Sequence, residues 1–128
     1  MGSFRTFLLA GFLAGAVAAV LANVVYGTFR LMGGTSYEEL SATTISLASV
    51  IPGLLGAVFY YGLTRWVGRP ATVLVAVALV AATADSVIVA VNEPQPGFAL
   101  IATPLHYVVA LSIALVLPAV ASRLAEKK

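Results

Sequence analysis

Four long apolar stretches, separated by short polar segments, constrain this chain more than any other feature. They cover residues 7–29, 42–63, 71–91 and 98–121. Each is long enough for the roughly 20 residues with which an α-helix crosses the hydrocarbon core of a bilayer. Only 9% of the 128 residues are charged and 61% are hydrophobic, which excludes an ordinary soluble domain. The sequence therefore predicts an all-α integral membrane protein, with one transmembrane domain over residues 1–128.

The segments between the apolar stretches predict how the helices are connected and oriented. They cover residues 33–40, 64–70 and 92–97, and such short connections favour an up-down four-helix bundle with antiparallel neighbours. The basic residues of the two termini and the second connection would then share one side: Arg5, Arg65, Arg69, Arg123, Lys127 and Lys128. The other side carries Glu38, Glu39 and Glu93, with Arg30 as its base. The positive-inside rule then places both termini in the cytoplasm.

One acid, Asp85, lies inside the third apolar stretch. A carboxylate at that depth costs about 3 kcal/mol or more unless it is paired, protonated or hydrated. The only histidine, His106, is its predicted partner, and Ser86 or a residue of another subunit are the alternatives. Asp85 therefore marks either a functional site or a structural bond inside a bundle.

Small residues form a stripe along each expected helix. In the first stretch Gly11, Gly15 and Ala19 recur at every fourth position and lead to Asn23, a GxxxG-type ridge along which helices approach closely. In the second stretch one helical face carries Ser46, Ser49, Gly53, Gly56 and Tyr60. In the last two, small residues accompany Asp85 and His106: Ala78, Ala81, Ala82, Ala102, Thr103 and Ala110. We expect these stripes to be helix-packing faces.

Polar residues on these stripes lie at a similar depth. Asn23, Ser46, Asp85 and His106 are each about 6 to 12 Å below the outer end of their stretch, at 1.5 Å per residue. With Ser49 they predict a polar layer in the outer half, facing an outward pocket above a dry inner half of Leu, Val and Ala. The alternative is that these groups only bond across helices and hold them in register.

Several chemistries have no signal in the sequence. It contains no GxGxxG after a strand, P-loop, GxSxG or HExxH motif, and no cysteine, so we predict neither an enzyme nor a metal site. The basic residues are few, which argues against nucleic-acid binding. His106 as an axial ligand to a tetrapyrrole is the one cofactor hypothesis kept open; no other cofactor is predicted.

The layout resembles a family. An Asn in the stretch from Ala19 to Tyr26, the PGLLGA segment from Pro52 to Ala57, the step Arg69 to Pro70 and His106 are similar to small uncharacterised bacterial membrane proteins grouped as a domain of unknown function. The resemblance covers most of the chain. It implies a four-helix fold, N-in/C-in topology and a bacterial plasma membrane, but no mechanism.

Two functions remain open. The first is an accessory or structural subunit, whose small-residue faces pack against partner subunits of a larger membrane complex or against copies of itself. The second is a small transporter or ligand-binding bundle with its polar pocket around Asp85 and His106. The sequence favours the accessory subunit, because so small a bundle rarely holds the inverted repeats of transporters.

Overall fold

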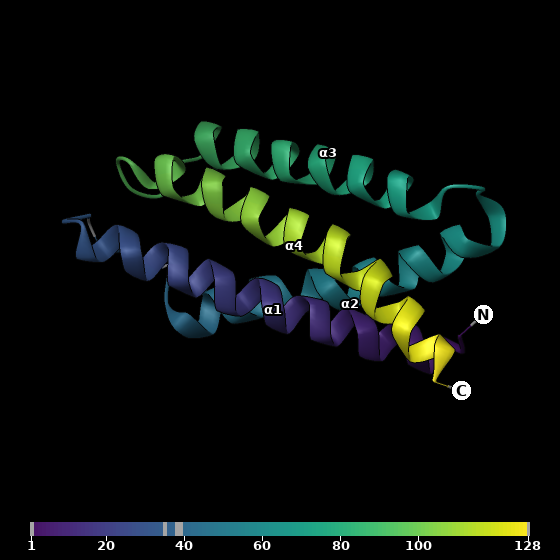
Figure 1. Cartoon of the computed structure of the whole chain (residues 1–128). Helices are drawn as coiled ribbons and strands as arrows, with labels where there is room; N and C mark the ends of the chain where they lie inside the picture. The colour runs from purple at the N-terminus through teal and green to yellow at the C-terminus, as the bar shows by residue number, and fades with distance from the viewer. Residues whose placement is uncertain (1, 35, 38–39, 128) are drawn as a thin grey trace.

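Serine caps and turn residues define where the helices begin. The computed structural model describes residues 2–34, 36–37 and 40–127. It contains four helices, shown in Figure 1: α1 (Phe4–Leu31), α2 (Ala42–Trp66), α3 (Pro70–Val91) and α4 (Phe98–Glu126). The side chains of Ser3 and Ser41 accept hydrogen bonds from the first-turn N–H groups of α1 and α2, which helix N-termini leave unpaired. Pro70 opens α3, at the position where a missing N–H costs least.

Two glycines with positive φ lie in the turns at the end of the molecule opposite the termini. Gly33, at φ 90°, follows the end of α1, and its N–H donates to the Arg30 carbonyl. Gly97, at φ 82°, precedes α4. Because residues with a Cβ rarely adopt this conformation, glycine at these two positions lets the chain reverse sharply.

All four helices are long and apolar enough to cross a membrane. This confirms the predicted all-helical chain with four membrane-spanning candidates. Three helices run two to five residues past the predicted apolar stretches, since polar residues such as Arg65 and Arg123 continue the helix beyond its apolar part. The acids Glu38 and Glu39 and the base Lys128, used in the topology prediction, lie outside the described residues.

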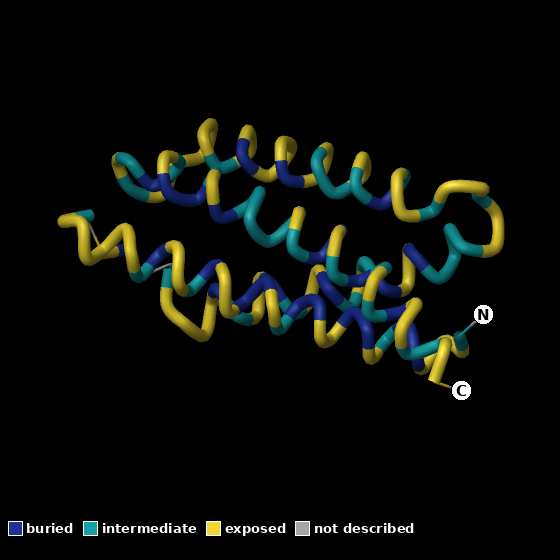
Figure 2. Tube along the Cα trace, in the orientation of Figure 1, coloured by how far each residue is buried: buried dark blue, intermediate teal, exposed yellow. Residues whose placement is uncertain are grey.

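The helices form an open row rather than a closed ring. α1 packs extensively on both α2 and α4, and α4 packs on α3, whereas α2 makes only sparse contact with α3 and α4. In Figure 2 the buried positions of α1 and α4 lie on the faces turned toward their neighbours. Both chain termini lie at one end of the molecule, together with the connection between α2 and α3 (Figure 1). α2 and α3, the two ends of the row, are therefore separated from each other along much of their length.

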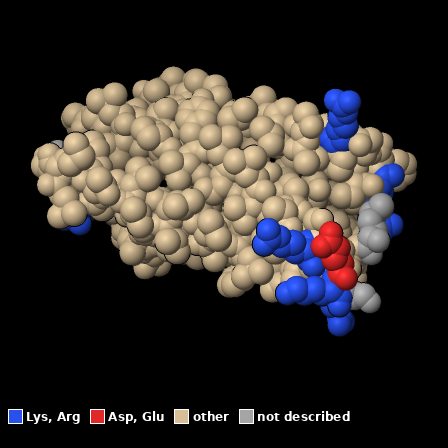
Figure 3. Space-filling model, viewed as in Figure 1, with Lys and Arg blue, Asp and Glu red and all other residues tan. Residues whose placement is uncertain are grey.

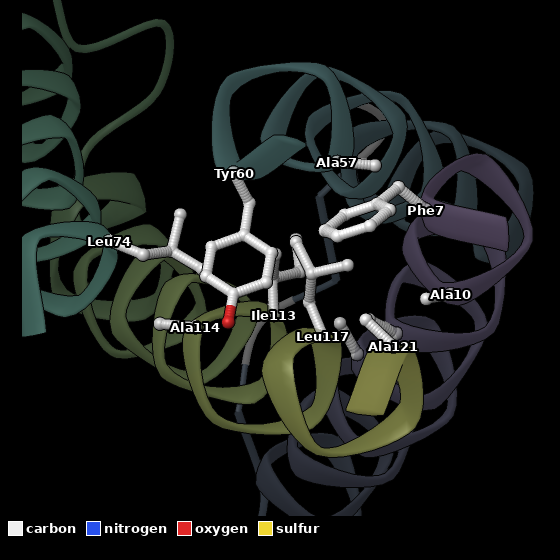
Figure 4. Close-up of a cluster of buried hydrophobic side chains, with 11 residues drawn as sticks. Phe7, Ala10, Ala57, Tyr60, Leu74, Ile113, Ala114, Leu117 and Ala121 are labelled. Atoms are coloured by element: carbon white, nitrogen blue, oxygen red, sulfur yellow. The ribbon is translucent and has the colours of Figure 1, made fainter. Parts of the chain in front are cut away.

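Two hydrophobic clusters hold the row together. The cluster at the end of the termini is drawn in Figure 4, where Phe7 of α1, Tyr60 of α2, Leu74 of α3 and Leu117 of α4 point toward one another. The second cluster lies near the opposite end and includes Ile45, Phe98, Ile101 and Leu105, with Tyr26 and Tyr37. The part of the molecule near the termini thus contains an apolar cluster to which all four helices contribute.

The closest helix contact is between α1 and α2. A Cβ added to Gly53 would lie 2.5 Å from the Gly11 carbonyl oxygen and 2.8 Å from the Gly15 Cα. Ala19, the third member of the ridge, is buried on the same helix. Gly56 faces α4 instead, where a Cβ would lie 3.3 Å from Ile113 Cγ2. The GxxxG-type ridge of α1 is therefore used within the chain.

Three tyrosines differ from what the sequence predicts. Their place near the ends of the apolar stretches indicates an aromatic belt at the membrane surface, but Tyr26, Tyr37 and Tyr60 are only 6%, 6% and 8% exposed. Their rings fill the two hydrophobic clusters, because the small residues of the neighbouring helices leave room for them. Trp66, by contrast, is fully on the surface at 88% exposed.

Charge is concentrated at the end of the termini. In Figure 3 most Lys and Arg side chains gather there, and the long middle of this face carries no charged atoms. The uncharged middle is the part that four apolar helices would place in lipid.

Candidate ligand-binding groove

A groove of about 610 Å³ lies between α2 and α3. On the α2 side its wall includes Pro52 and Gly56, and on the α3 side Ala78 and Ala81. These side chains are too short to reach across the space between the two helices, so they leave it open. The size is typical of a small-molecule pocket.

The floor of the groove is α4. His106, Val109 and Ile113 line it, and they belong to the helix that packs between α1 and α3. On the side of the termini the groove ends at Leu74 and Ile113, which belong to the hydrophobic cluster drawn in Figure 4. Its mouth therefore lies between α2 and α3, at the side of the bundle, whereas the sequence predicted an opening at the outer end.

Asp85 is the charged residue of the groove. It lines the space from α3, about 9 Å before the end of that helix at 1.5 Å per residue, and its side chain is exposed. Within the described part of the chain, Asp85 forms no hydrogen bond and no ion pair, and it lines the same groove as His106. The predicted closeness of the two residues is thus present, but a direct bond between them is not.

His106 is held by Ser86 rather than by Asp85. Its Nδ1 lies 3.1 Å from Ser86 Oγ, and that hydroxyl donates to the Ala82 carbonyl oxygen at 2.7 Å. Ser86 is buried. It follows Asp85 in α3, and its side chain lies on the face of α3 that contacts α4. The sequence named Ser86 only as a possible partner of Asp85, since a serine in a helix more often bonds its own backbone.

The other predicted polar residues lie elsewhere. Asn23 Nδ2 donates to the Ala19 carbonyl at 2.7 Å and to Ser46 Oγ at 3.4 Å, across the contact between α1 and α2. Ser49 is fully buried and donates to the Ile45 carbonyl at 2.7 Å. The groove lining includes none of these three residues. The structure therefore divides the predicted polar layer into an α1–α2 pair and an α3–α4 group, and only the second borders the groove.

A proline changes the α2 wall. Pro52 has no N–H, so the carbonyl of Ala48 lacks the donor that an α-helix normally supplies four residues later. Both residues are exposed and line the groove. The sequence did not predict that this part of α2 borders the same space as Asp85.

Hydrogen bonds of Tyr37 link the two connections at the end of the molecule opposite the termini. The Tyr37 N–H donates to the Tyr26 hydroxyl at 3.0 Å, and the Tyr37 hydroxyl donates to the Pro96 carbonyl at 3.2 Å. The Tyr37 ring also packs edge-on against Phe98, which lines the outer end of the groove. These contacts hold α4 beside α1 and α2 at the end where α2 and α3 separate.

Fold and groove together define a protein with four helices apolar enough to span a membrane and with a lateral, mostly apolar groove. In comparisons with protein-family models, curated proteins and solved structures, no match to this chain is found. The resemblance to a family of small four-helix membrane proteins stays a prediction. Among the described residues no group of three or more His, Cys, Asp and Glu could hold a metal ion. The tetrapyrrole hypothesis for His106 likewise stays a prediction.

Proposed function

We propose that this protein is a ligand-binding bundle of the membrane, whose site is the α2–α3 groove. One observation carries the proposal: an apolar space of about 610 Å³ holds a single carboxylate, Asp85, and beside it the only histidine. Binding sites are typically apolar cavities with a few polar groups that orient the ligand.

The proposal includes an orientation. We place the four helices across a bacterial plasma membrane in up-down order, with both termini in the cytoplasm. The support is the gathering of Lys and Arg at the end of the termini (Figure 3) and the positive-inside rule. The bacterial membrane rests on the family resemblance alone. In this orientation Asp85 and His106 lie in the outer half of the bilayer, and the groove extends from that half past the middle of α2 and α3 and reaches the lipid through its mouth.

A test uses the protein extracted from its native membranes into polymer-bounded nanodiscs, with mass spectrometry of everything that co-purifies. Ala81 lines the groove, so Ala81→Trp fills it with an indole ring. Val20, 63% exposed on α1 and outside the groove, gives the matched control Val20→Trp. We expect a small molecule that accompanies the wild type and Val20→Trp but is depleted at least about tenfold in Ala81→Trp, because the indole takes its place. Equal small-molecule content in all three would contradict the proposal.

The accessory subunit is the second candidate. The groove lining runs along α2 from Thr44 to Phe59, about 22 Å at 1.5 Å per residue, a length that suits a helix of a partner subunit or of a second copy. The internal use of the Gly11 and Gly15 ridge removes the face that the sequence had assigned to partners. In the same experiment, a stoichiometric polypeptide lost from Ala81→Trp would favour this candidate.

A further inference from the structure

We propose that the α2–α3 groove binds a primary or secondary ammonium ion with a compact apolar body, and that Asp85 is its counter-ion. The inference rests on the proposed function and names the ligand class of the same site. Three properties of the groove carry it: its charge, its hydrogen-bonding groups and its apolar walls.

The charge of the groove is uncompensated. Asp85 is the one carboxylate among the lining residues, and none of them is Lys or Arg. Within the described residues Asp85 has no ion pair. A carboxylate in a low-dielectric space is costly until a cation pairs with it. A bound cation therefore stabilises the groove, whereas a bound anion would add repulsion.

The His106 ring adds an acceptor rather than a donor. The single hydroxyl proton of Ser86 goes to the Ala82 carbonyl, so Ser86 Oγ can only accept at its 3.1 Å contact with His106 Nδ1. The hydrogen-bond network therefore assigns the proton of the neutral ring to Nδ1 and leaves Nε2 as an acceptor. His106 lines the groove beside Asp85.

The opposite wall contributes a third acceptor. Pro52 cannot donate to the Ala48 carbonyl, and both residues line the groove. The Thr44 hydroxyl, at the outer end, already shares a hydrogen bond of 2.9 Å with Ser41. The residues that line the groove thus carry a carboxylate, a ring nitrogen and a carbonyl oxygen, all of which accept. A primary or secondary ammonium carries two or three N–H donors for such a set, while a quaternary ammonium carries none.

The apolar walls of the groove favour an apolar body on the ligand beside its ammonium group. Leu55, Phe59, Leu74, Val77 and Val109 surround the acceptors with apolar surface. An apolar body gains free energy by leaving water for this surface. The mouth between α2 and α3 also allows such an amphiphilic cation to enter from the bilayer, where its apolar part partitions.

The test measures equilibrium binding to the full chain in nanodiscs of zwitterionic phosphatidylcholine, with empty nanodiscs as the blank. Three probes share one apolar cage: adamantan-1-ylammonium, the neutral adamantan-1-ol and quaternary trimethyl(adamantan-1-yl)ammonium. The variants are Asp85→Asn, Asp85→Glu and, as matched control, Glu126→Gln, an exposed carboxylate outside the groove. Circular dichroism and gel filtration establish that each variant is folded.

We expect the primary ammonium to bind the wild type about tenfold or more tighter than either other probe. Asp85→Asn should weaken it by about 10- to 100-fold, the range of a charge-assisted hydrogen bond. Asp85→Glu, which keeps the charge, should retain most of the affinity, and Glu126→Gln all of it.

Three results would overturn the inference. If adamantan-1-ol binds as tightly as the ammonium and Asp85→Asn changes nothing, the groove binds ligands without regard to charge, and the proposed function stands alone. If the quaternary ion binds as tightly as the primary one, the acceptor set is not used. If no probe binds the wild type, the ligand class is wrong. The proposed function falls as well only if Ala81→Trp leaves the native co-purifying molecules unchanged.

Discussion

At the scale of single residues, Ser86 is the side chain on which the site geometry depends. Its hydroxyl links the backbone of α3 to His106 on α4. We expect Ser86→Ala to lower the free energy of unfolding by about 1–3 kcal/mol, because the Nδ1–H of His106 loses its acceptor in a partly buried position. The measurement is unfolding in mixed micelles with rising dodecyl sulfate, followed by circular dichroism.

Ser112 supplies the control for that variant. Its hydroxyl donates at 2.6 Å to the Val108 carbonyl of its own helix and links no second element. Ser112→Ala should therefore change stability by less than about 0.5 kcal/mol. Equal losses for the two variants would mean that the bond between Ser86 and His106 contributes nothing.

Residue types predicted part of this site. Asp85 was singled out because an acid in an apolar stretch is costly, and His106 because it is the only histidine of the sequence. Both residues line the groove. Asn23 and Ser46 share their depth but lie at the contact between α1 and α2, because depth along a helix does not determine which neighbour a face meets. The partner of His106 could not be predicted, since a serine satisfies itself equally well on its own backbone.

At the scale of helices, two glycines of α2 differ in how closely a neighbouring helix approaches them. A Cβ at Gly53 would lie 2.5 Å from the Gly11 carbonyl oxygen, whereas one at Gly62 would meet nothing within 4 Å. Gly53→Ala should therefore cost about 1–3 kcal/mol through overpacking of α1 against α2. Gly62→Ala should cost nothing, or stabilise α2 by up to about 1 kcal/mol.

The same unfolding assay compares the two alanines directly. A stable Gly53→Ala would contradict the close contact between α1 and α2. The sequence predicted four helices and the small-residue ridge, because both follow from local spacing. It did not predict the gap between α2 and α3: short connections imply that consecutive helices are neighbours, but α2 and α3 make only sparse contact, and Gly56, Ala78 and Ala81 line the space between them.

At the scale of the whole molecule, the proposed orientation in the membrane rests on the distribution of charge. The chain contains no cysteine, so a single introduced thiol reports on one position. We expect Pro94→Cys, in the exposed connection before α4, to react with a membrane-impermeant maleimide on intact spheroplasts. Gly68→Cys, exposed between α2 and α3, should react only after permeabilisation. The reverse pattern would place the termini outside and contradict the positive-inside argument.

The central claim is that α2 and α3 stay apart in the membrane because a small molecule occupies the space between them. The most direct measurement is an experimental structure of the protein, extracted from its native membranes into nanodiscs without detergent. We predict compact non-protein density in the groove, in contact with the Asp85 carboxylate. Direct packing of α2 against α3, with the groove closed and Asp85 turned to a protein partner, would contradict the account.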